Sequence, residues 1–208
     1  MCRKVNILKT LKPIILASAS QSRRSLLSAS GVEFDVVVSN VDEDEIKNIA
    51  KQDGWTVSKT ALALAAAKAE AVQTMHPEAI IIGADQMLEL EGNWFDKPSS
   101  VEVAKKQLEA LRGKTHRLLS GLVLLAPEKE RWTHIESADL TMRNFSDTFL
   151  DSYIQTLGEE ACKSVGGYFL EGLGVQMFDQ VRGDYFTILG LPMAPLLNAL
   201  RLEGALLL

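Results

Sequence analysis

Short, strongly apolar runs alternate with helical patterns along this chain, and this alternation limits the folds open to it. Residues 13–17 read as a buried strand and residues 34–38 as a second strand, with a helix at 21–30 between them. An alanine-rich helix is predicted at about 57–75, followed by another short buried strand at 79–83. Helices and strands in this order predict an α/β fold built around a mixed sheet.

The remaining segments continue the mixture of helices and strands. The elements predicted there are a loop at 41–47, a half-buried strand at 87–92, a turn at 93–98, a helix from a Ser99–Glu102 capping box to Leu111, strands within 115–145, a helix capped by Ser146, at least one strand pair within 165–190 and a helix opened by Pro192. No repeat or long linker separates them. We therefore expect one domain over residues 1–208, with residues 1–12 as a loosely ordered N-terminal extension.

Net charge and cysteine content narrow the class of protein. With a formal net charge of −5, the chain is a poor candidate for general binding of nucleic acid or membrane surfaces. Its two cysteines stand far apart, which is typical of a reduced cytoplasmic protein, and its three histidines lack the spacing of a zinc site. No run approaches the roughly 20 apolar residues of a membrane span. We expect a cytoplasmic protein in which local clusters of positive charge meet any anionic ligand.

The stretch IILASASQSRRSLL, residues 14–27, places hydroxyl and guanidinium groups where a strand gives way to a helix. A helix N-terminus attracts anions, because it offers unpaired backbone N–H groups and the positive end of the helix dipole. Arg23 lies in the first turn, where a cation is unfavourable unless an anion compensates it. An anion bound at this helix start explains the pattern. The alternative is an ordinary serine N-cap followed by solvated arginines.

Two charged residues stand in apolar surroundings. Lys68 falls in the middle of an apolar helical stripe, which costs free energy unless its amine reaches a partner or solvent. Asp85 follows the buried strand at 79–83, and ligand crevices in α/β sheets lie outside strand ends. An Asp at such a place suits a metal ligand or a general base, or it caps a turn. The stripe consists of Ala61, Leu64, Ala65, Val72 and Met75.

Two further charged residues lie in predicted turns and loops. Lys97, in DKP at 96–98, is a cation in a turn fixed by proline, although taken alone a solvated turn lysine is the favoured explanation. Glu43, in the acidic run VDEDE, offers an oxygen ligand to a hard divalent cation, or belongs to a solvated loop. Together, the serine-rich helix start, the cations and the carboxylates are the parts of a site for a polyphosphate with magnesium.

Motifs spread over residues 14–204 together resemble one family. They are LASASQSRRSLL, VDE, AAAKA, GADQ, DKP, ALRGKTH, GGYFLEGLG and GLP. By these motifs the chain resembles the Maf-like nucleotide pyrophosphatases, also named septum-formation inhibitors. The resemblance implies hydrolysis of a nucleoside triphosphate to the monophosphate and pyrophosphate with a divalent metal, Mg²⁺ or Mn²⁺. It also implies a mixed twisted sheet flanked by helices with a central cleft, as in inosine triphosphatases, and a homodimer as one possible assembly.

Matching positions carry the family's site onto this chain, as the resemblance implies. Asp85 corresponds to the catalytic carboxylate, and it shares the metal site with Glu43. The positions that bind the substrate phosphates in the family are occupied here by Ser18, Arg23, Lys68 and Lys97.

Three residues are candidates for reading the nucleobase. Gln86 and Glu171 resemble the family branch that acts on 7-methyl-GTP, whereas the dTTP/UTP branch tends to have Thr and Gln there. Ser22 matches neither branch, because this position holds Trp in one and Arg in another, and Gln21 replaces the proline of many members. A guanine edge suits both a carboxylate acceptor and an amide donor. The residues thus favour GTP-type substrates, and the conflicting branch positions leave the preferred base open.

Two other functions use the same charges. One is a nucleotide-binding regulator without turnover, linked to cell-division arrest, as the family's historical name suggests. The other is a phosphate-monoester hydrolase or kinase. Release of pyrophosphate argues against both, so product identity separates the three.

Overall fold

The structure of the protein is a computed structural model that describes residues 10–207. The predicted N-terminal extension at 1–12 therefore lies mostly outside the described residues. Its last part is tied to the C-terminal end of the chain: the Leu11 N–H donates to the Ala205 carbonyl at 2.8 Å, and the Lys12 ammonium donates to the Glu203 carbonyl at 2.6 Å. For residues 1–9, loose order stays a prediction.

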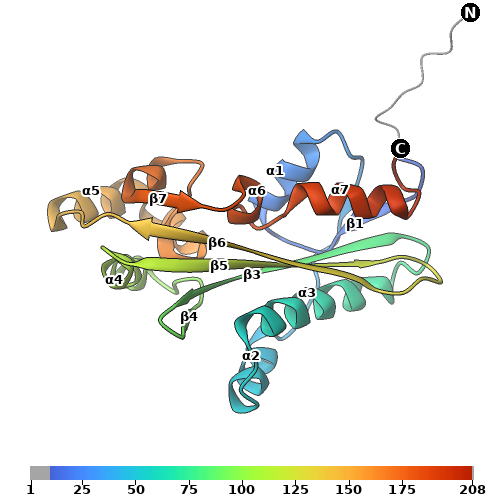
Figure 1. The fold of residues 1–208 in the computed structure, drawn as a ribbon, viewed down its shortest axis with the longest axis horizontal. Coiled ribbons are helices and arrows are strands. Elements are labelled where there is room, and N and C mark those ends of the chain that lie inside the picture. Colours follow the sequence, from blue (N-terminus) through green and yellow to red (C-terminus); the bar gives the residue numbers. More distant parts are fainter. Residues whose placement is uncertain (1–9, 208) are drawn as a thin grey trace, which may run out of the picture. The chain divides into compact units, whose positions relative to one another are not determined.

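Within the described residues, seven strands form one mixed sheet (Figure 1). They are β1 (Ile14–Leu16), β2 (Asp35–Val36), β3 (Ile80–Leu90), β4 (Asn93–Phe95), β5 (Thr115–Leu125), β6 (Trp132–Met142) and β7 (Phe178–Arg182). The order along the sheet is β2-β1-β3-β5-β6-β7, with β4 beside β3. β1 pairs in parallel with β2 and β3, whereas β4 and β7 pair antiparallel with β3 and β6. The predicted α/β fold with a mixed sheet is confirmed.

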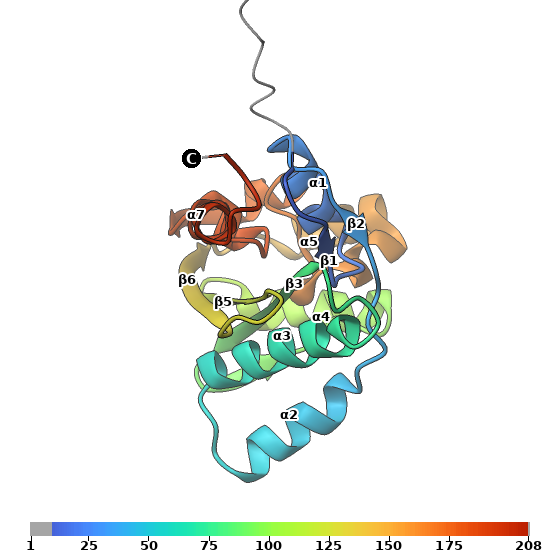
Figure 2. The same ribbon diagram turned by 90° about the vertical axis from the view of Figure 1, so that its right-hand side faces the viewer.

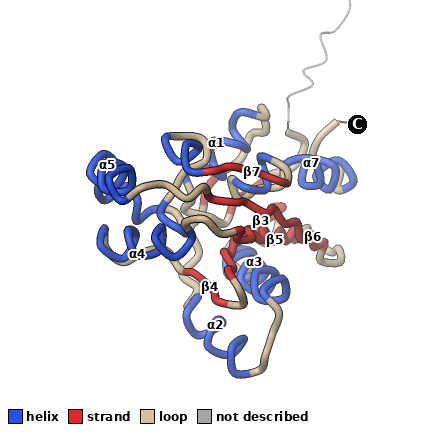
Figure 3. The backbone as a smooth tube through the Cα atoms, turned by 60° about the vertical axis from the view of Figure 1, so that its left-hand side comes forward, coloured by secondary structure: helices blue, strands red, loops and turns tan. Residues whose placement is uncertain are grey.

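Helices flank this sheet and are drawn in blue in Figure 3. They are α1 (Gln21–Ala29), α2 (Glu43–Gln52), α3 (Val57–Gln73), α4 (Val101–Leu111), α5 (Asp147–Leu157), α6 (Tyr185–Ile188) and α7 (Met193–Leu202). Between α5 and β7 run the 3₁₀ helices η1 (Gly158–Lys163), η2 (Val165–Gly167) and η3 (Leu173–Met177). Helices α1 to α5 each start at a side-chain N-cap, supplied in turn by Ser20, Asp42, Thr56, Ser100 and Ser146.

The chain forms two compact units, and β3, β5 and β6 contribute to both. The first unit holds the residues up to Asp85, Ser120–Glu136 and the residues from Leu189 onward. The second holds Gln86–Leu119 and Ser137–Ile188. A single functional domain over residues 1–208 stays a prediction, and the units are described one at a time.

The core of the first unit has two layers, one on each face of its strands. Ile14 and Leu16 of β1 join the apolar cluster that contains side chains of α1 and α7, whereas Ile15 joins the cluster that contains side chains of α3. Ile80 and Ile81 of β3 divide in the same way, because successive strand residues point to opposite faces. Figure 2 shows α3 on one side of these strands and α1 and α7 on the other. Burial on both faces explains why these strands read as continuous apolar runs.

Two glycines let α3 lie directly on the sheet. A Cβ atom on Gly83 of β3 would lie 2.1 Å from the Ala65 carbonyl oxygen, and one on Gly121 of β5 would lie 2.9 Å from the Ala61 carbonyl oxygen. Both alanines are fully buried. This close approach brings Lys68, one helical turn beyond Ala65, within reach of β3.

The second unit is organised around α4, which packs against α5, η1 and η2. Leu108 and Leu111 of α4 are fully buried, and so is Leu150 of α5. Gly167 at the end of η2 lies against Leu108, since a Cβ atom there would be 3.5 Å from the Leu108 Cγ. This packing supports the segment that continues to Glu171.

Two predicted boundaries near the candidate site are wrong. The acidic run at 41–47 is not a loop, because Asp42 accepts the Glu45 N–H at 2.9 Å and caps α2. The carboxylates in the first turn of α2 suit the positive end of the helix dipole. The strand predicted at 87–92 is no separate element either, because β3 runs without a break to Leu90.

Three further details differ from the sequence prediction. Ser100 and not Ser99 caps α4, with its Oγ accepting the Val103 N–H at 3.3 Å. Met75, assigned to the apolar stripe of α3, lies beyond the end of that helix and is exposed. Residues 165–190 contain one strand, β7, and several short helices. β7 pairs with β6, so the strand pair predicted within this segment is not formed.

We predict that Gly83→Ala destabilises the protein by at least about 2 kcal/mol, because the new methyl group meets a helix backbone that cannot move aside easily. Urea unfolding of the purified variant measures the change. Gly172→Ala is the matched control: the nearest atoms to its Cβ would be 3.8 Å away, so we expect a change within about 0.5 kcal/mol. Equal stability of the two variants would contradict the close packing of α3 on β3.

Candidate functional site

Two serines build the start of α1. Ser20 is its N-cap, and its Oγ accepts the Arg23 N–H at 3.4 Å. Ser18 is buried just after β1, and its Oγ accepts the Ser20 N–H at 3.3 Å. The serine N-cap of the simpler interpretation is therefore present. Arg24 is exposed, as that interpretation also expects, but Arg23 is buried.

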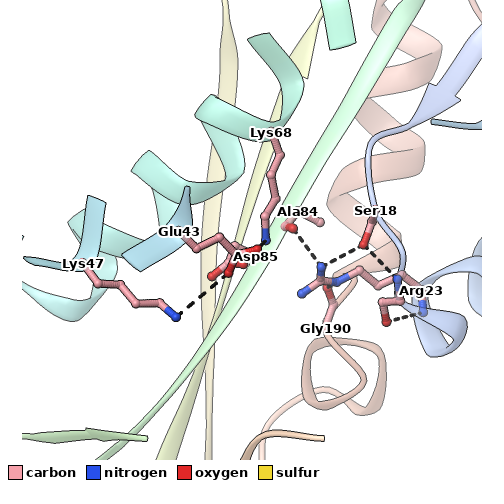
Figure 4. A network of polar contacts seen from close by, with 9 residues as sticks. Ser18, Arg23, Glu43, Lys47, Lys68, Ala84, Asp85 and Gly190 are labelled. Atoms are coloured by element: carbon pink, nitrogen blue, oxygen red, sulfur yellow. Dashed lines mark hydrogen bonds and ion pairs between the residues drawn. The ribbon is translucent and has the colours of Figure 1, made fainter. Parts of the chain in front are cut away.

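The Arg23 guanidinium joins three segments of the first unit (Figure 4). Its Nε donates to the Gly190 carbonyl at 2.9 Å, and its Nη1 donates to the Ala84 carbonyl at 2.8 Å and to the Ser18 Oγ at 3.1 Å. Gly190 has a φ of 88°, and a Cβ atom there would lie 3.2 Å from the Arg23 Nε. Glycine at this position therefore permits both the backbone turn and the close approach. Arg23 is a structural crosslink as well as a local positive charge.

Nearby carboxylates compensate the buried charge of Arg23. Burial lowers the pKa of Arg23 below its ordinary value, and the negative charges of Asp85 and Glu43 act in the opposite direction. An arginine stays protonated even so, because its ordinary pKa is very high. The start of α1 and the carboxylates thus share one electrostatic environment.

Lys68 bridges the two carboxylates that the sequence assigns to the metal site (Figure 4). Its Nζ lies 2.6 Å from Asp85 Oδ1 and 2.8 Å from Glu43 Oε1. The side chains of Lys68 and Asp85 are only 11% and 8% exposed. Lys68 is therefore paired and does not extend into solvent. Asp85 lies inside β3, not beyond a strand end, and contacts α3 through Lys68.

Lys47 is a member of this cluster that the sequence prediction missed. It lies one helical turn after Glu43 on α2, and its Nζ is 4.0 Å from Glu43 Oε2. The side chain of Lys47 is 16% exposed. A signal for it exists in the sequence, because Asp42 and Glu45 have the spacing of a capping box, which predicts a helix and hence this pairing.

The two carboxylates have the chemistry of a site for a hard divalent cation. Asp85 and Glu43 both contact one cation, the Lys68 ammonium, so their oxygens converge on positive charge. Among residues 10–207, no group of three or more histidine, cysteine, aspartate or glutamate side chains forms a metal site. Mg²⁺ is commonly held by one or two protein carboxylates, with substrate phosphates and water completing its shell. The residues present fit that pattern.

The structure brings together only part of the predicted site. The residues assembled in the first unit are Ser18, Arg23, Glu43, Lys68 and Asp85. Lys97, Gln86 and Glu171 belong to the second unit, where Lys97 and Glu171 are exposed. Ser22 is half-buried on α1. A common site for all of these residues stays a prediction.

The amide of Gln86 already has backbone partners. Its Nε2 donates to the carbonyls of Thr187 and Ile188, each at 3.0 Å. These bonds attach β3 to α6 immediately after Asp85. To donate to a guanine O6, the Gln86 amide would have to give up one of these two hydrogen bonds. Base reading by Gln86 therefore stays a prediction.

Comparison with known proteins identifies the family. The sequence profile of the family described as Maf-like protein matches residues 13–203. The chain belongs to the Maf-like protein family.

Curated relatives match this chain over nearly their whole length. A nucleoside triphosphate pyrophosphatase of Paramagnetospirillum magneticum is 47% identical over 192 residues, which cover 92% of this chain and 99% of that protein. One of Granulibacter bethesdensis is 44% identical, covering 93% and 98%. A 7-methyl-GTP pyrophosphatase of Rhizobium meliloti is 43% identical, covering 94% and 99%.

Solved structures give a more distant match. The nucleoside-triphosphatase, or dITP/XTP pyrophosphatase, of Mycobacterium abscessus is similar with a TM-score of 0.44 and 15% sequence identity, covering 92% of this chain and 94% of that chain. No helix within residues 10–207 has the length and apolar character needed to cross a membrane.

We predict that Lys68→Met destabilises the protein by roughly 2–4 kcal/mol, because it leaves the buried Asp85 carboxylate without its cation. Adding Asp85→Asn should recover part of the loss, since the double variant no longer buries an unpaired charge. Urea unfolding of both variants measures these changes. Lys106→Met, at an exposed position of α4, is the control and should change stability little. A single variant as stable as wild type would show that Asp85 does not depend on Lys68.

Proposed function

We propose that this protein hydrolyses nucleoside triphosphates to the monophosphate and pyrophosphate. The observation that carries the proposal is the cluster in which the Lys68 ammonium lies 2.6 Å from Asp85 and 2.8 Å from Glu43, beside the buried guanidinium of Arg23. Relatives that match over nearly their whole length are named nucleoside triphosphate pyrophosphatases, which supports the same reaction. Cations and carboxylates arranged in this way suit a triphosphate that arrives with a metal ion.

The start of α1 is the proposed binding place for substrate phosphates. Among residues 10–207, partners are found for three of the five N–H donors of Arg23, and we propose that the two on Nη2 bind an anion. The crosslinked guanidinium is already fixed, so little entropy is lost when an anion binds to it. Ser18 and the first N–H groups of α1 add donors and a favourable dipole. Lys97 is the remaining phosphate contact that the family resemblance implies.

Asp85 is the proposed catalytic carboxylate. It would hold a divalent metal ion together with Glu43, or it would orient the attacking water by accepting its proton. When bound, such an ion neutralises phosphate charge and lowers the pKa of a coordinated water. Lys68 holds the Asp85 carboxylate in place through the 2.6 Å ion pair, and it supplies positive charge as the phosphoanhydride between the α and β phosphates breaks. Mg²⁺ and Mn²⁺ are the proposed ions.

A cytoplasmic location and a homodimer are part of the proposal, and they rest on composition and on the resemblance. GTP-type nucleotides, modified ones included, are the proposed substrates. The relative named 7-methyl-GTP pyrophosphatase supports this choice. The Glu171 side chain is exposed and therefore hydrated. Its contribution to selectivity arises when a bound base displaces this water.

We predict that Asp85→Asn reduces pyrophosphate release by about 10²-fold or more, because the amide keeps the size of the side chain and removes its charge. The assay measures pyrophosphate and monophosphate from GTP, with Mg²⁺, Mn²⁺ or EDTA. Asp151→Asn is the control, since that carboxylate lies in a surface ion pair with Lys105.

Three outcomes would refute the proposed reaction. They are release of inorganic phosphate instead of pyrophosphate, binding of nucleotide without turnover, and an Asp85→Asn variant that retains more than half of the wild-type rate. The first would indicate a phosphatase, and the second a nucleotide-binding regulator.

We predict that Glu171→Gln narrows or reverses a preference for GTP over UTP without abolishing hydrolysis. A carboxylate accepts the N–H donors of a guanine edge, whereas an amide also offers a donor to the carbonyls of uracil. The change in the ratio of kcat/KM should be about 5-fold or more. Values of kcat/KM for GTP, 7-methyl-GTP, UTP and dTTP test it. An unchanged ratio would remove Glu171 as a reader of the base.

A further inference from the structure

A buried polar cluster in the second unit takes no part in the proposed chemistry. It consists of His116 on β5, Tyr168 after η2 and Tyr153 on α5. Their exposed fractions are 1%, 3% and 5%, in that order. Buried polar side chains cost free energy unless they are hydrogen-bonded, so their placement requires an explanation. Their hydrogen bonds all involve the segment at residues 166–171.

His116 fixes the hydroxyl of Tyr168. The His116 Nε2 lies 2.6 Å from the Tyr168 Oη, and the two rings meet edge to face. Burial lowers the pKa of His116 to about 4, whereas the charge of Asp139 acts in the opposite direction, and burial raises the pKa of Tyr168. Both groups are therefore neutral at pH 7. Among residues 10–207, the His116 Nδ1 has no hydrogen-bond partner, so the bond to Tyr168 is the polar contact that holds this imidazole.

Tyr153 holds the same segment from the side of α5. Its hydroxyl donates to the Gly167 carbonyl at 3.4 Å. Burial raises the pKa of Tyr153 to about 12, and the charge of Glu171 contributes to this rise. Tyr153 thus attaches α5 to the backbone of residues 166–171.

Two glycines mark places where the backbone before and after Glu171 packs closely against other atoms. A Cβ atom on Gly166 would lie 2.8 Å from the Leu88 Cδ1, and one on Gly174 would lie 2.5 Å from the Phe169 carbonyl oxygen. Both glycines are buried. The backbone is thus closely packed at Gly166 and Gly174, whereas Glu171 between them is exposed.

We propose that His116, Tyr168 and Tyr153 are positioning residues that fix residues 166–171 and so set the nucleobase selectivity exerted by Glu171. The inference rests on the proposed function, in which Glu171 reads the base. A carboxylate on a mobile loop discriminates poorly, because it can adapt to either edge and loses entropy when it binds. Two buried hydroxyls remove that freedom without touching the nucleotide themselves.

The experiment uses the full chain with Tyr168→Phe and Tyr153→Phe, which remove one hydroxyl each and keep the rings packed. We expect each variant to lower the GTP-to-UTP ratio of kcat/KM by about 5-fold or more, with kcat for GTP within about 3-fold of wild type. Tyr185→Phe is the matched control, because this third tyrosine is 47% exposed and lies outside the cluster. It should leave the ratio unchanged.

Combination with Glu171→Gln distinguishes positioning from a general loss of stability. If the tyrosines act through Glu171, then adding Tyr168→Phe to the Glu171→Gln variant should have little effect. The GTP-to-UTP ratio of kcat/KM should change by less than 2-fold, or about 0.4 kcal/mol. His116→Phe should match Tyr168→Phe, and the two together should add nothing further, because both remove the same bond. A merely structural role predicts a lower Tm with an unchanged ratio.

Binding of GTP and UTP in EDTA, measured by calorimetry, separates this inference from the proposed reaction. If wild type binds GTP more tightly than UTP but releases no pyrophosphate, the proposed reaction fails while the positioning role is tested by the ratio of Kd values. The positioning role is overturned by an unchanged ratio in both tyrosine variants, by additive effects with Glu171→Gln, or by a wild type that does not distinguish the two nucleotides.

Discussion

The ion pair between Lys68 and Asp85 depends on how closely a helix can lie on a sheet. Gly83 and Gly121 present no side chains to α3, and Ala65 faces them, so the two backbones approach to a distance that Cβ atoms would prevent. A lysine on the inner face of α3 then spans the remaining gap and meets a carboxylate that points out of β3. Because both charges are buried, neither is tolerated without the other. The same contact that builds the apolar core therefore also fixes the charged centre of the candidate site.

Charge compensation extends outward from that pair. Glu43 contacts the same ammonium from α2, and Lys47 lies near Glu43 on the next turn. On the other side, Arg23 is bound to the Ala84 carbonyl, one residue before Asp85. The cluster is thus held by elements from both faces of the sheet, with β3 between them. Under the proposed function, a polyphosphate would meet a set of charges that is already ordered, which lowers the reorganisation that catalysis requires.

The sequence correctly predicted the elements whose apolar patterns are long or are bounded by clear capping or turn residues. The alanine-rich helix, the strand before Gly83 and the helix after Ser146 agree with the structure, because core packing and local propensity favour the same conformation there. The acidic run around Glu43 was misassigned, since carboxylates suggest a solvated loop until Asp42 is seen as an N-cap. Individual candidates of the site were visible as charges out of place. The partners of Arg23 were not, because Ala84 and Gly190 contribute backbone carbonyls, which no side-chain pattern can reveal.

The bond from Arg23 to the Gly190 carbonyl joins residues separated by 167 positions. A ribosome delivers residue 23 long before residue 190, and α7, which completes one face of the first core, comes later still. Throughout synthesis, the nascent chain therefore carries an arginine whose final acceptor does not yet exist and an apolar face that stays uncovered. Local helices can form early, but the first unit closes only when the last residues arrive. Its completion is thus a late event, and a chain without residue 190 lacks one of the bonds that fix Arg23.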